Sequence, residues 1–209
     1  MGNINVIYIL FVSIFVPILL MTLLVEKKAR LPIMFMLTGI FVLVFASEVN
    51  GLLAKWLSMD KYSLTVTVTP ITEELLKALP ILYYAMVISD KREVLFTASM
   101  ATGIGFAILE NAFYLLDYPN LSVLSTIIRA FGAGLMHGMC TLLVGVGISF
   151  VKKKGKLFAV GTFGLLSTAI VYHGIYNILI QSKYSMVGAL LPIVTYIPFF
   201  IWRLRIRHR

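Results

Sequence analysis

The chain alternates between long apolar stretches and short polar connections. Each stretch can cross a hydrocarbon core of about 30 Å at about 1.5 Å of rise per residue. Strands of a membrane barrel are shorter and alternate in polarity, so the pattern predicts an all-α polytopic membrane protein, with one transmembrane domain over residues 1–209. The seven predicted helices cover residues 4–25, 31–56, 70–88, 94–116, 122–150, 157–181 and 185–202.

The composition supports the membrane class. Hydrophobic residues make up 60% of the chain and charged residues 13%, whereas soluble domains contain about 45–50% and about 25%. The first apolar run is too long for the core of a signal peptide, and no Lys or Arg precedes it, so we expect it to be retained as a helix. The single cysteine, Cys140, excludes a disulfide within the chain.

The net charge of +9 is divided unevenly between alternate connections, which predicts an orientation. Under the positive-inside rule the basic connections lie in the cytoplasm, so the N-terminus and the 57–69 and 117–121 loops should lie outside and the C-terminus inside. Basic loops of this kind contact anionic lipid and do not indicate nucleic-acid binding. Only Lys55, Lys61 and Lys183 fall on the outer side, against thirteen on the inner: Lys27, Lys28, Arg30, Lys91, Arg92, Lys152, Lys153, Lys154, Lys156, Arg203, Arg205, Arg207 and Arg209.

Eight ionisable residues remain inside or at the heads of the apolar stretches, where a charge costs roughly 2.5–3.5 kcal/mol on insertion scales. The predicted orientation places Glu73 about one turn, Glu110 about 9 Å and His173 about 12 Å below the outer ends of their helices. A shared depth on different helices predicts a site that opens outward, with Glu48 in the same outer half. The eight are Glu48, Glu73, Glu74, Lys77, Glu110, Arg129, His137 and His173.

Helical spacing puts several of these residues on common faces. His173 and Asn177 are one turn apart, and Lys77 is placed to pair with Glu73 or Glu74. Small residues nearby predict close helix approach or room for a substrate backbone, and one pair has the spacing of a GxxxG packing motif. They are Gly103, Gly105, Gly132, Gly174 and the GxxxG pair Gly134 and Gly138.

This set of side chains contains what peptide hydrolysis in a membrane requires. A desolvated carboxylate can activate water, and histidine, asparagine or a metal ion can stabilise the oxyanion. The same residues could instead hold Zn²⁺ in a His/His/Glu set, with a further glutamate as the base. No HExxH or GxSxG motif is present, which disfavours zincin and serine-hydrolase arrangements. The catalytic candidates are Glu73, Glu74, Glu110, His137, His173 and Asn177, and the metal candidates are Glu110, His137 and His173.

Simpler structural interpretations exist for some residues. Acidic side chains such as Glu73 and Glu74 suit the start of a helix. Glu48 could be a buried group bonded to a neighbour, and Arg129 a structural counter-charge. We place both of these in a supporting role.

Four segments resemble, in order and spacing, the motifs of the PrsW family of intramembrane proteases, within the wider CAAX-protease superfamily. They are TEELLKALP (72–80), GIGFAILENAFYLL (103–116), IIRAFGAGLMHGMCT (127–141) and VYHGIYN (171–177), and they span a motif core of residues 70–180. The resemblance implies catalytic roles for Glu73, Glu74, Glu110, His137 and His173. It adds Lys77 and Asn111 as motif residues and leaves Asn177 as proton acceptor or oxyanion donor.

The resemblance also implies a reaction and a setting. It points to a first cleavage of a single-pass membrane protein, notably an anti-sigma factor, in the cell membrane. The chemistry is either metal-dependent or based on glutamate-activated water. Two other classes of function stay open. A proton-coupled transporter would more often show repeated halves or paired broken helices, and a non-catalytic membrane scaffold of the same superfamily would show no cleavage.

Overall fold

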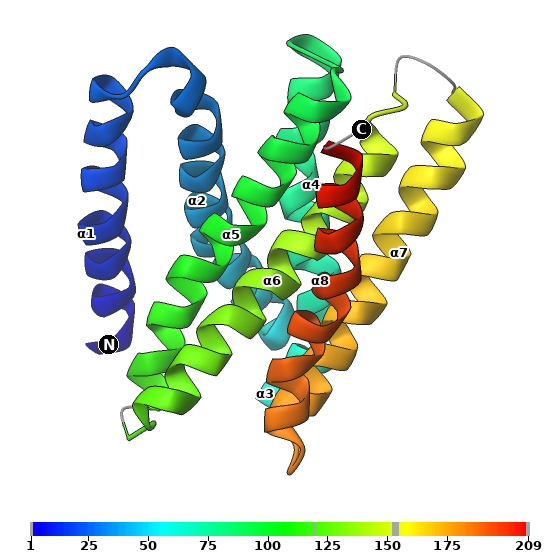
Figure 1. The fold of residues 1–209 in the computed structure, drawn as a ribbon. Helices are drawn as coiled ribbons and strands as arrows, with labels where there is room; N and C mark the ends of the chain where they lie inside the picture. Colours follow the sequence, from blue (N-terminus) through cyan, green and yellow to red (C-terminus); the bar gives the residue numbers. More distant parts are fainter. Residues whose placement is uncertain (1, 119, 152–154, 208–209) are drawn as a thin grey trace.

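The computed structural model describes residues 2–118, 120–151 and 155–207. Seven long helices make up most of this part of the chain (Figure 1). Each lies where hydropathy predicts one, and the described residues contain no strand. The all-α prediction is therefore confirmed. The long helices are α1 (Gly2–Leu24), α2 (Lys27–Trp56), α4 (Thr69–Val87), α5 (Arg92–Asp117), α6 (Val123–Ile148), α7 (Gly155–Ile180) and α8 (Ser185–Arg207).

Five of the described helices are long and apolar enough to cross a membrane: α1, α2, α5, α6 and α7. Helix α4 has three charged side chains in its first half, Glu73, Glu74 and Lys77. The apolar part of α8 is a shorter segment, Ser185–Pro198. The count of seven membrane crossings therefore stays a prediction.

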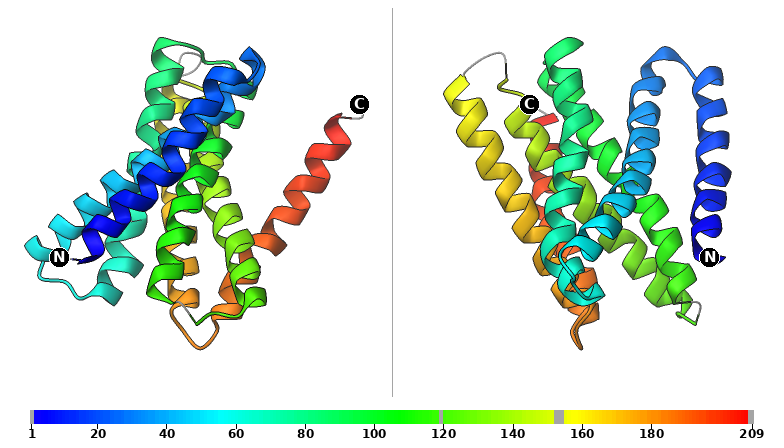
Figure 2. Two further views of the ribbon diagram at one scale, coloured as in Figure 1. Left: turned by 90° about the vertical axis from the view of Figure 1, so that its left-hand side faces the viewer. Right: turned by 180° about the vertical axis from the view of Figure 1, so that it is seen from behind.

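The helices run alternately in opposite directions, so the connections gather at two ends of the bundle (Figures 1 and 2). One end holds the starts of α2 and α5 and the end of α8, and we call it the basic end because Lys27, Lys28, Lys91 and Arg92 lie there. The N-terminus and the turn between α7 and α8 lie at the opposite end. The side of the membrane that each end faces stays a prediction. Of the thirteen basic residues, Lys152, Lys153, Lys154 and Arg209 lie outside the described residues.

The connection before α4 is shorter than predicted. Helical backbone begins at α3 (Lys61–Ser63) and continues through the π-helix η1 (Leu64–Val68) directly into α4. Asp60 caps this run by accepting hydrogen bonds from the backbone amide and hydroxyl of Ser63, and these bonds hold the pKa of Asp60 below its ordinary value. The predicted loop 57–69 is therefore wrong for residues 61–69.

The extra helix changes the depth of the glutamate pair. Residues 64–69 read LTVTVT, and β-branched residues have low helix propensity, so local sequence does not predict a helix there. Because the helix starts at Lys61, Glu73 lies about 18 Å along it. The prediction of one turn below the helix end is wrong by about two turns.

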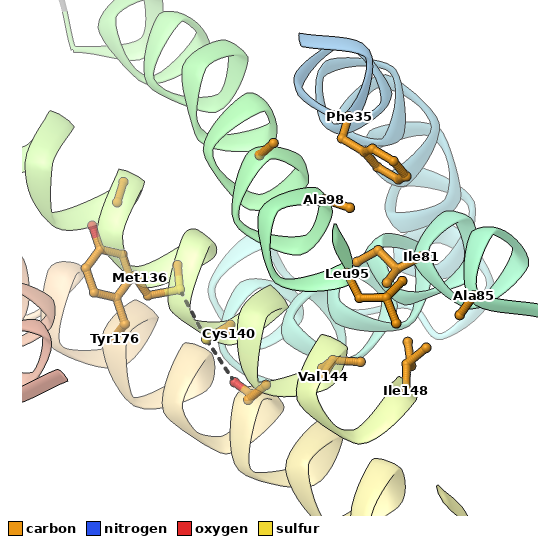
Figure 3. Close-up of a cluster of buried hydrophobic side chains, with 13 residues drawn as sticks. Phe35, Ile81, Ala85, Leu95, Ala98, Met136, Cys140, Val144, Ile148 and Tyr176 are labelled. Atoms are coloured by element: carbon orange, nitrogen blue, oxygen red, sulfur yellow. Dashed lines mark hydrogen bonds between the residues drawn. The ribbon is translucent and has the colours of Figure 1, made fainter. Parts of the chain in front are cut away.

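Apolar packing is concentrated toward the basic end, where side chains of α2, α4, α5, α6 and α7 form a buried cluster (Figure 3). A second cluster joins α2 and α5. Along α4 the apolar residues Ile81 and Ala85 follow the charged residues, and along α6 Val144 and Ile148 follow His137. The charged residues therefore lie around the middle of the bundle, beside the apolar cluster.

Close crossings between helices occur at particular glycines. A methyl group added at Gly103 would overlap the backbone of His137, and one added at Gly105 would overlap the backbone of Met36. At Gly134 an added methyl would meet nothing within 4 Å, and at Gly138 its nearest contact would be an ordinary 3.5 Å. The predicted packing role of the GxxxG pair is therefore wrong for Gly134, whereas Gly138 lies at the α5–α6 crossing that Gly103 makes possible.

Candidate active site

Ionisable side chains from four helices converge around the middle of the bundle. All are buried except Glu110, which has 27% of its side chain exposed. Of the six residues, Glu110 is the most accessible from the surface. The group, called the active-site cluster below, consists of Glu73, Glu74 and Lys77 of α4, Glu110 of α5, His137 of α6 and His173 of α7.

Glu74 is the hub of the cluster. Its Oε1 atom accepts a hydrogen bond from Nζ of Lys77 at 2.6 Å and lies 2.8 Å from Nδ1 of His173. Because a carboxylate accepts, the shared proton belongs on Nδ1 of His173. Glu74 therefore compensates a buried ammonium and sets the orientation and tautomer of His173.

His137 is held from both sides. Nζ of Lys77 lies 2.9 Å from its Nδ1, and Oε2 of Glu110 lies 3.0 Å from its Nε2. An ammonium group has no lone pair, so it donates to Nδ1, and the neutral ring carries its proton on Nε2. Glu110 then accepts that proton's hydrogen bond. Lys77 and Glu110 together select one tautomer of His137.

Two buried atoms face each other without hydrogen-bond partners among the described residues. They are Oε2 of Glu73 and Nε2 of His173, which lie 3.8 Å apart. Buried polar atoms are rarely left unpaired, and such a pair indicates a place for a water molecule, an ion or a reacting group. We regard this pair as the reactive point of the cluster.

Aromatic rings close the cluster on one side. The ring of Phe106 lies 4.8 Å from the His137 ring and 4.5 Å from Nζ of Lys77. The rings of His137 and His173 are nearly perpendicular, with centroids 4.9 Å apart. An apolar wall keeps the local dielectric low, which strengthens the hydrogen bonds within the cluster.

The cluster also offers ligands for a metal ion. One atom each of Glu73, His137 and His173 lies within 4.8 Å of the others. His173 has the arrangement common in metal sites, with a carboxylate on one nitrogen and the other nitrogen free. Both nitrogens of His137 are engaged, so it would have to release Glu110 or Lys77 to bind a metal. The residues fit a metal in type and spacing, and the set that the geometry brings together contains Glu73, whereas the predicted set with Glu110 stays a prediction.

Asn177 is one turn from His173 but has a different partner. Its Nδ2 atom donates to the backbone carbonyl of Thr65 at 3.0 Å, in the π-helix η1. In the π register that carbonyl would accept from the amide of residue 70, and Pro70 has no N–H. Asn177 of α7 thus donates to a carbonyl that has no donor within its own helix because of Pro70. This contact ties the start of the α3–α4 helix to α7.

Three residues that the sequence placed in a supporting role form no hydrogen bond or ion pair with the cluster within the described part of the chain. Glu48 is exposed and accepts a hydrogen bond from Tyr8 at 3.0 Å, which links α1 to α2. Its placement beside the site is wrong because its face of α2 turns toward α1. Asn111 has a buried Oδ1 atom without a partner. The guanidinium of Arg129 lies 3.4 Å above the Tyr114 ring, and none of the ion pairs found in the described residues includes it.

The structure reveals neighbours that sequence reasoning missed. Asn50 of α2 is buried and accepts a hydrogen bond from the hydroxyl of Thr72 at 2.5 Å, one residue before Glu73. Tyr176 is buried, with a hydroxyl that has no partner among the described residues. An amide in a long apolar stretch was a usable signal for Asn50. The sequence contains no comparable signal for Tyr176, because tyrosine is common in apolar helices.

Comparison with known proteins gives one match. The family model described as PrsW family intramembrane metalloprotease matches residues 27–203. This range contains the whole active-site cluster and excludes α1. No curated protein and no solved structure matches the chain.

Proposed function

The chain belongs to the PrsW family of intramembrane metalloproteases, and from this we propose that it is an endopeptidase cutting a single-pass membrane protein near the outer face of the membrane. The family supports a membrane-embedded peptidase. The observation that supports the proposed site is the unpaired, buried pair formed by Oε2 of Glu73 and Nε2 of His173. Water held between these atoms would have a base on one side and an acceptor on the other.

The proposed reaction assigns one proton route. Glu73 takes a proton from the water while the hydroxide attacks the carbonyl carbon of the scissile peptide. The N–H of His137 at Nε2 turns from Glu110 to the developing oxyanion. Glu73 then passes its proton to the leaving nitrogen as the C–N bond breaks. Glu74 and Lys77 hold both histidines in place through these steps.

The same residues support metal-assisted chemistry. A divalent ion such as Zn²⁺ would be held by Glu73, His137 and His173, and it would polarise the carbonyl and make bound water a better nucleophile. With Glu73 engaged in this way, Glu110 is the remaining carboxylate that can hold a proton beside the site. Asn177 serves in either case as a contact that orders the helix before Glu73.

The direction of opening supports a first cut in regulated proteolysis. Glu110 and His173 lie in the halves of α5 and α7 away from the basic end, and the positive-inside rule makes that end extracytoplasmic. A single-pass protein such as an anti-sigma factor would present its outer juxtamembrane segment there, in the cell membrane. We propose residues 1–209 as one transmembrane protease domain.

Cleavage tests the proposal directly. The purified chain, reconstituted in lipid, is mixed with a single-pass reporter and the products are identified by mass spectrometry. We expect Glu73→Gln to lower the rate by about 10²–10⁴, the usual contribution of a general base. Glu93→Gln, an exposed glutamate in the first turn of α5, is the matched control and should cut normally. A wild-type chain that cuts no reporter while it moves protons or solute across the bilayer would favour the transporter alternative, and one that does neither would favour the scaffold.

A further inference from the structure

Arg129 lines a cavity outside the active-site cluster, with a mostly apolar lining and a few polar groups. The cavity has a volume of about 130 Å³ and lies where α5 ends and α6 and α8 begin. Its polar lining groups are Arg129, Ser125, Ser185 and Tyr114. At about 30 Å³ per water molecule, it has room for roughly four waters. A single carboxylate side chain fits such a space.

Arg129 forms no ion pair within 4 Å among the described residues. Its guanidinium rests on Tyr114 at 3.4 Å, and its buried Nε atom has no hydrogen-bond partner among the described residues. Glu110 is close enough for the two charges to interact, yet it pairs with His137. Arg129 is interpreted from the sequence as a structural counter-charge, but no carboxylate forms a direct ion pair with it in the described residues. A guanidinium with free donors in a low-dielectric cavity favours an anionic ligand.

The spacing of residues along α6 sets the distance between the Arg129 cavity and the active-site cluster. Arg129 and His137 are eight residues apart on the same helical face, which corresponds to about 12 Å. An extended peptide covers this distance in about four residues at about 3.3 Å each. A peptide held at the active-site cluster can therefore place a side chain in the Arg129 cavity.

We propose that the Arg129 cavity binds an aspartate or glutamate side chain of the substrate, about four residues from the scissile bond on the side that leaves the membrane. The proposal rests on the proposed protease function. A peptide is favoured over a lipid because the cavity lies about four extended residues along α6 from His137, within reach of a chain held at the active-site cluster.

Chemical protection tests the cavity without any cleavage. Phenylglyoxal modifies accessible arginines, and mass spectrometry reports each site in the full chain reconstituted in phosphatidylcholine. We expect N-acetyl-aspartate N-methylamide to slow modification of Arg129 at least about 10-fold, the factor expected for hydrogen bonds between charged groups. The neutral asparagine analogue should give little protection. Arg92 is the internal control, because it also lies over an aromatic ring, Phe96 at 5.2 Å, but at the basic end.

A second experiment measures whether cleavage depends on the position of an aspartate in the substrate. Aspartate is moved stepwise through the outer segment of a single-pass reporter, and cleavage should peak when it lies about four residues from the cut. Arg129→Gln should remove the peak, Arg129→Lys should keep part of it, and Arg92→Gln should leave it unchanged. Folding of each variant is checked by its thermal unfolding midpoint.

The outcomes separate the proposals. Protection of Arg129 without any cleavage would count against the protease function and leave the anion site standing. Equal protection by the aspartate and asparagine compounds, no protection by either, or protection only in phosphatidylglycerol bilayers would overturn the peptide-carboxylate site. A flat aspartate scan with normal cleavage would overturn it as well.

Discussion

Lys77 of α4 and His137 of α6, sixty residues apart in the chain, are joined by a contact of 2.9 Å between Nζ and Nδ1. The contact fixes which nitrogen of His137 carries the proton and so which one can donate toward a substrate. Lys77 is itself fully buried and bonded to Glu74. In the proposed reaction, Lys77 would therefore act through His137 and, by way of Glu74, through His173.

Replacing Lys77 by methionine should change the tautomer of His137. Methionine has similar length but no donor, so the proton of His137 is no longer confined to Nε2. The ¹⁵N shifts of labelled His137 report the change directly. We expect cleavage to fall by about 10–100-fold, as for other residues that orient a functional histidine. A variant with lowered activity but unchanged His137 shifts would contradict this role.

Metal affinity distinguishes the two possible ligand sets. We expect Glu73→Gln and His173→Ala to weaken Zn²⁺ binding at least about 10-fold, because both residues offer a free ligand atom. Glu110→Ala should retain binding, since removing Glu110 releases Nε2 of His137. Titration calorimetry on metal-stripped protein measures each affinity. Loss of binding in Glu110→Ala with normal binding in Glu73→Gln would restore Glu110 to the ligand set.

A double substitution tests the role of Asn177. The amide of Asn177 donates to the carbonyl of Thr65, which Pro70 leaves without a backbone donor. The substitution Pro70→Ala would supply a backbone N–H at that position. Asn177→Ala alone should reduce activity by about 10-fold or more, and Pro70→Ala in the same chain should recover most of the loss. Cleavage rate and thermal unfolding are measured together. An oxyanion donor would behave differently, because no change at Pro70 could replace it, and Asn177→Asp would then repel the oxyanion.

Gly103 and Gly134 provide a matched pair of glycine substitutions. Gly103→Ala places a methyl group against the backbone of His137, and we expect a loss of about 1–3 kcal/mol in the free energy of unfolding together with reduced cleavage. Gly134→Ala meets nothing within 4 Å and should be neutral or stabilise by up to about 1 kcal/mol. Thermal unfolding in detergent compares the two. Equal destabilisation would mean that the α5–α6 crossing does not depend on Gly103.

Cysteine labelling tests the orientation. In a Cys140→Ala background, a cysteine at Ser58 should react with an impermeant maleimide in intact cells, and a cysteine at Lys91 should react only after the cells are opened. Both positions are exposed and lie at opposite ends of the bundle. Labelling of position 91 from outside would reverse the topology and the side on which the substrate is cut.

The sequence by itself determined the class of the protein, the seven helices and the six residues that meet in the cluster. The physical reason is that long apolar runs have one stable solution in lipid, and a charge inside such a run is too costly to be retained without a partner. Hence all six could be singled out without any coordinates: Glu73, Glu74, Lys77, Glu110, His137 and His173.

Tertiary structure alone decided how those residues are connected. Which oxygen of Glu74 serves His173, and which nitrogen of His137 faces Lys77, depends on the rotation of each helix about its axis, and hydropathy does not fix that rotation. The helical turn through residues 61–69 also depends on distant contacts, because its β-branched residues disfavour helix and α7 supplies the donor that Pro70 lacks. The partnerless charge of Arg129 became visible only when the surrounding side chains were in place.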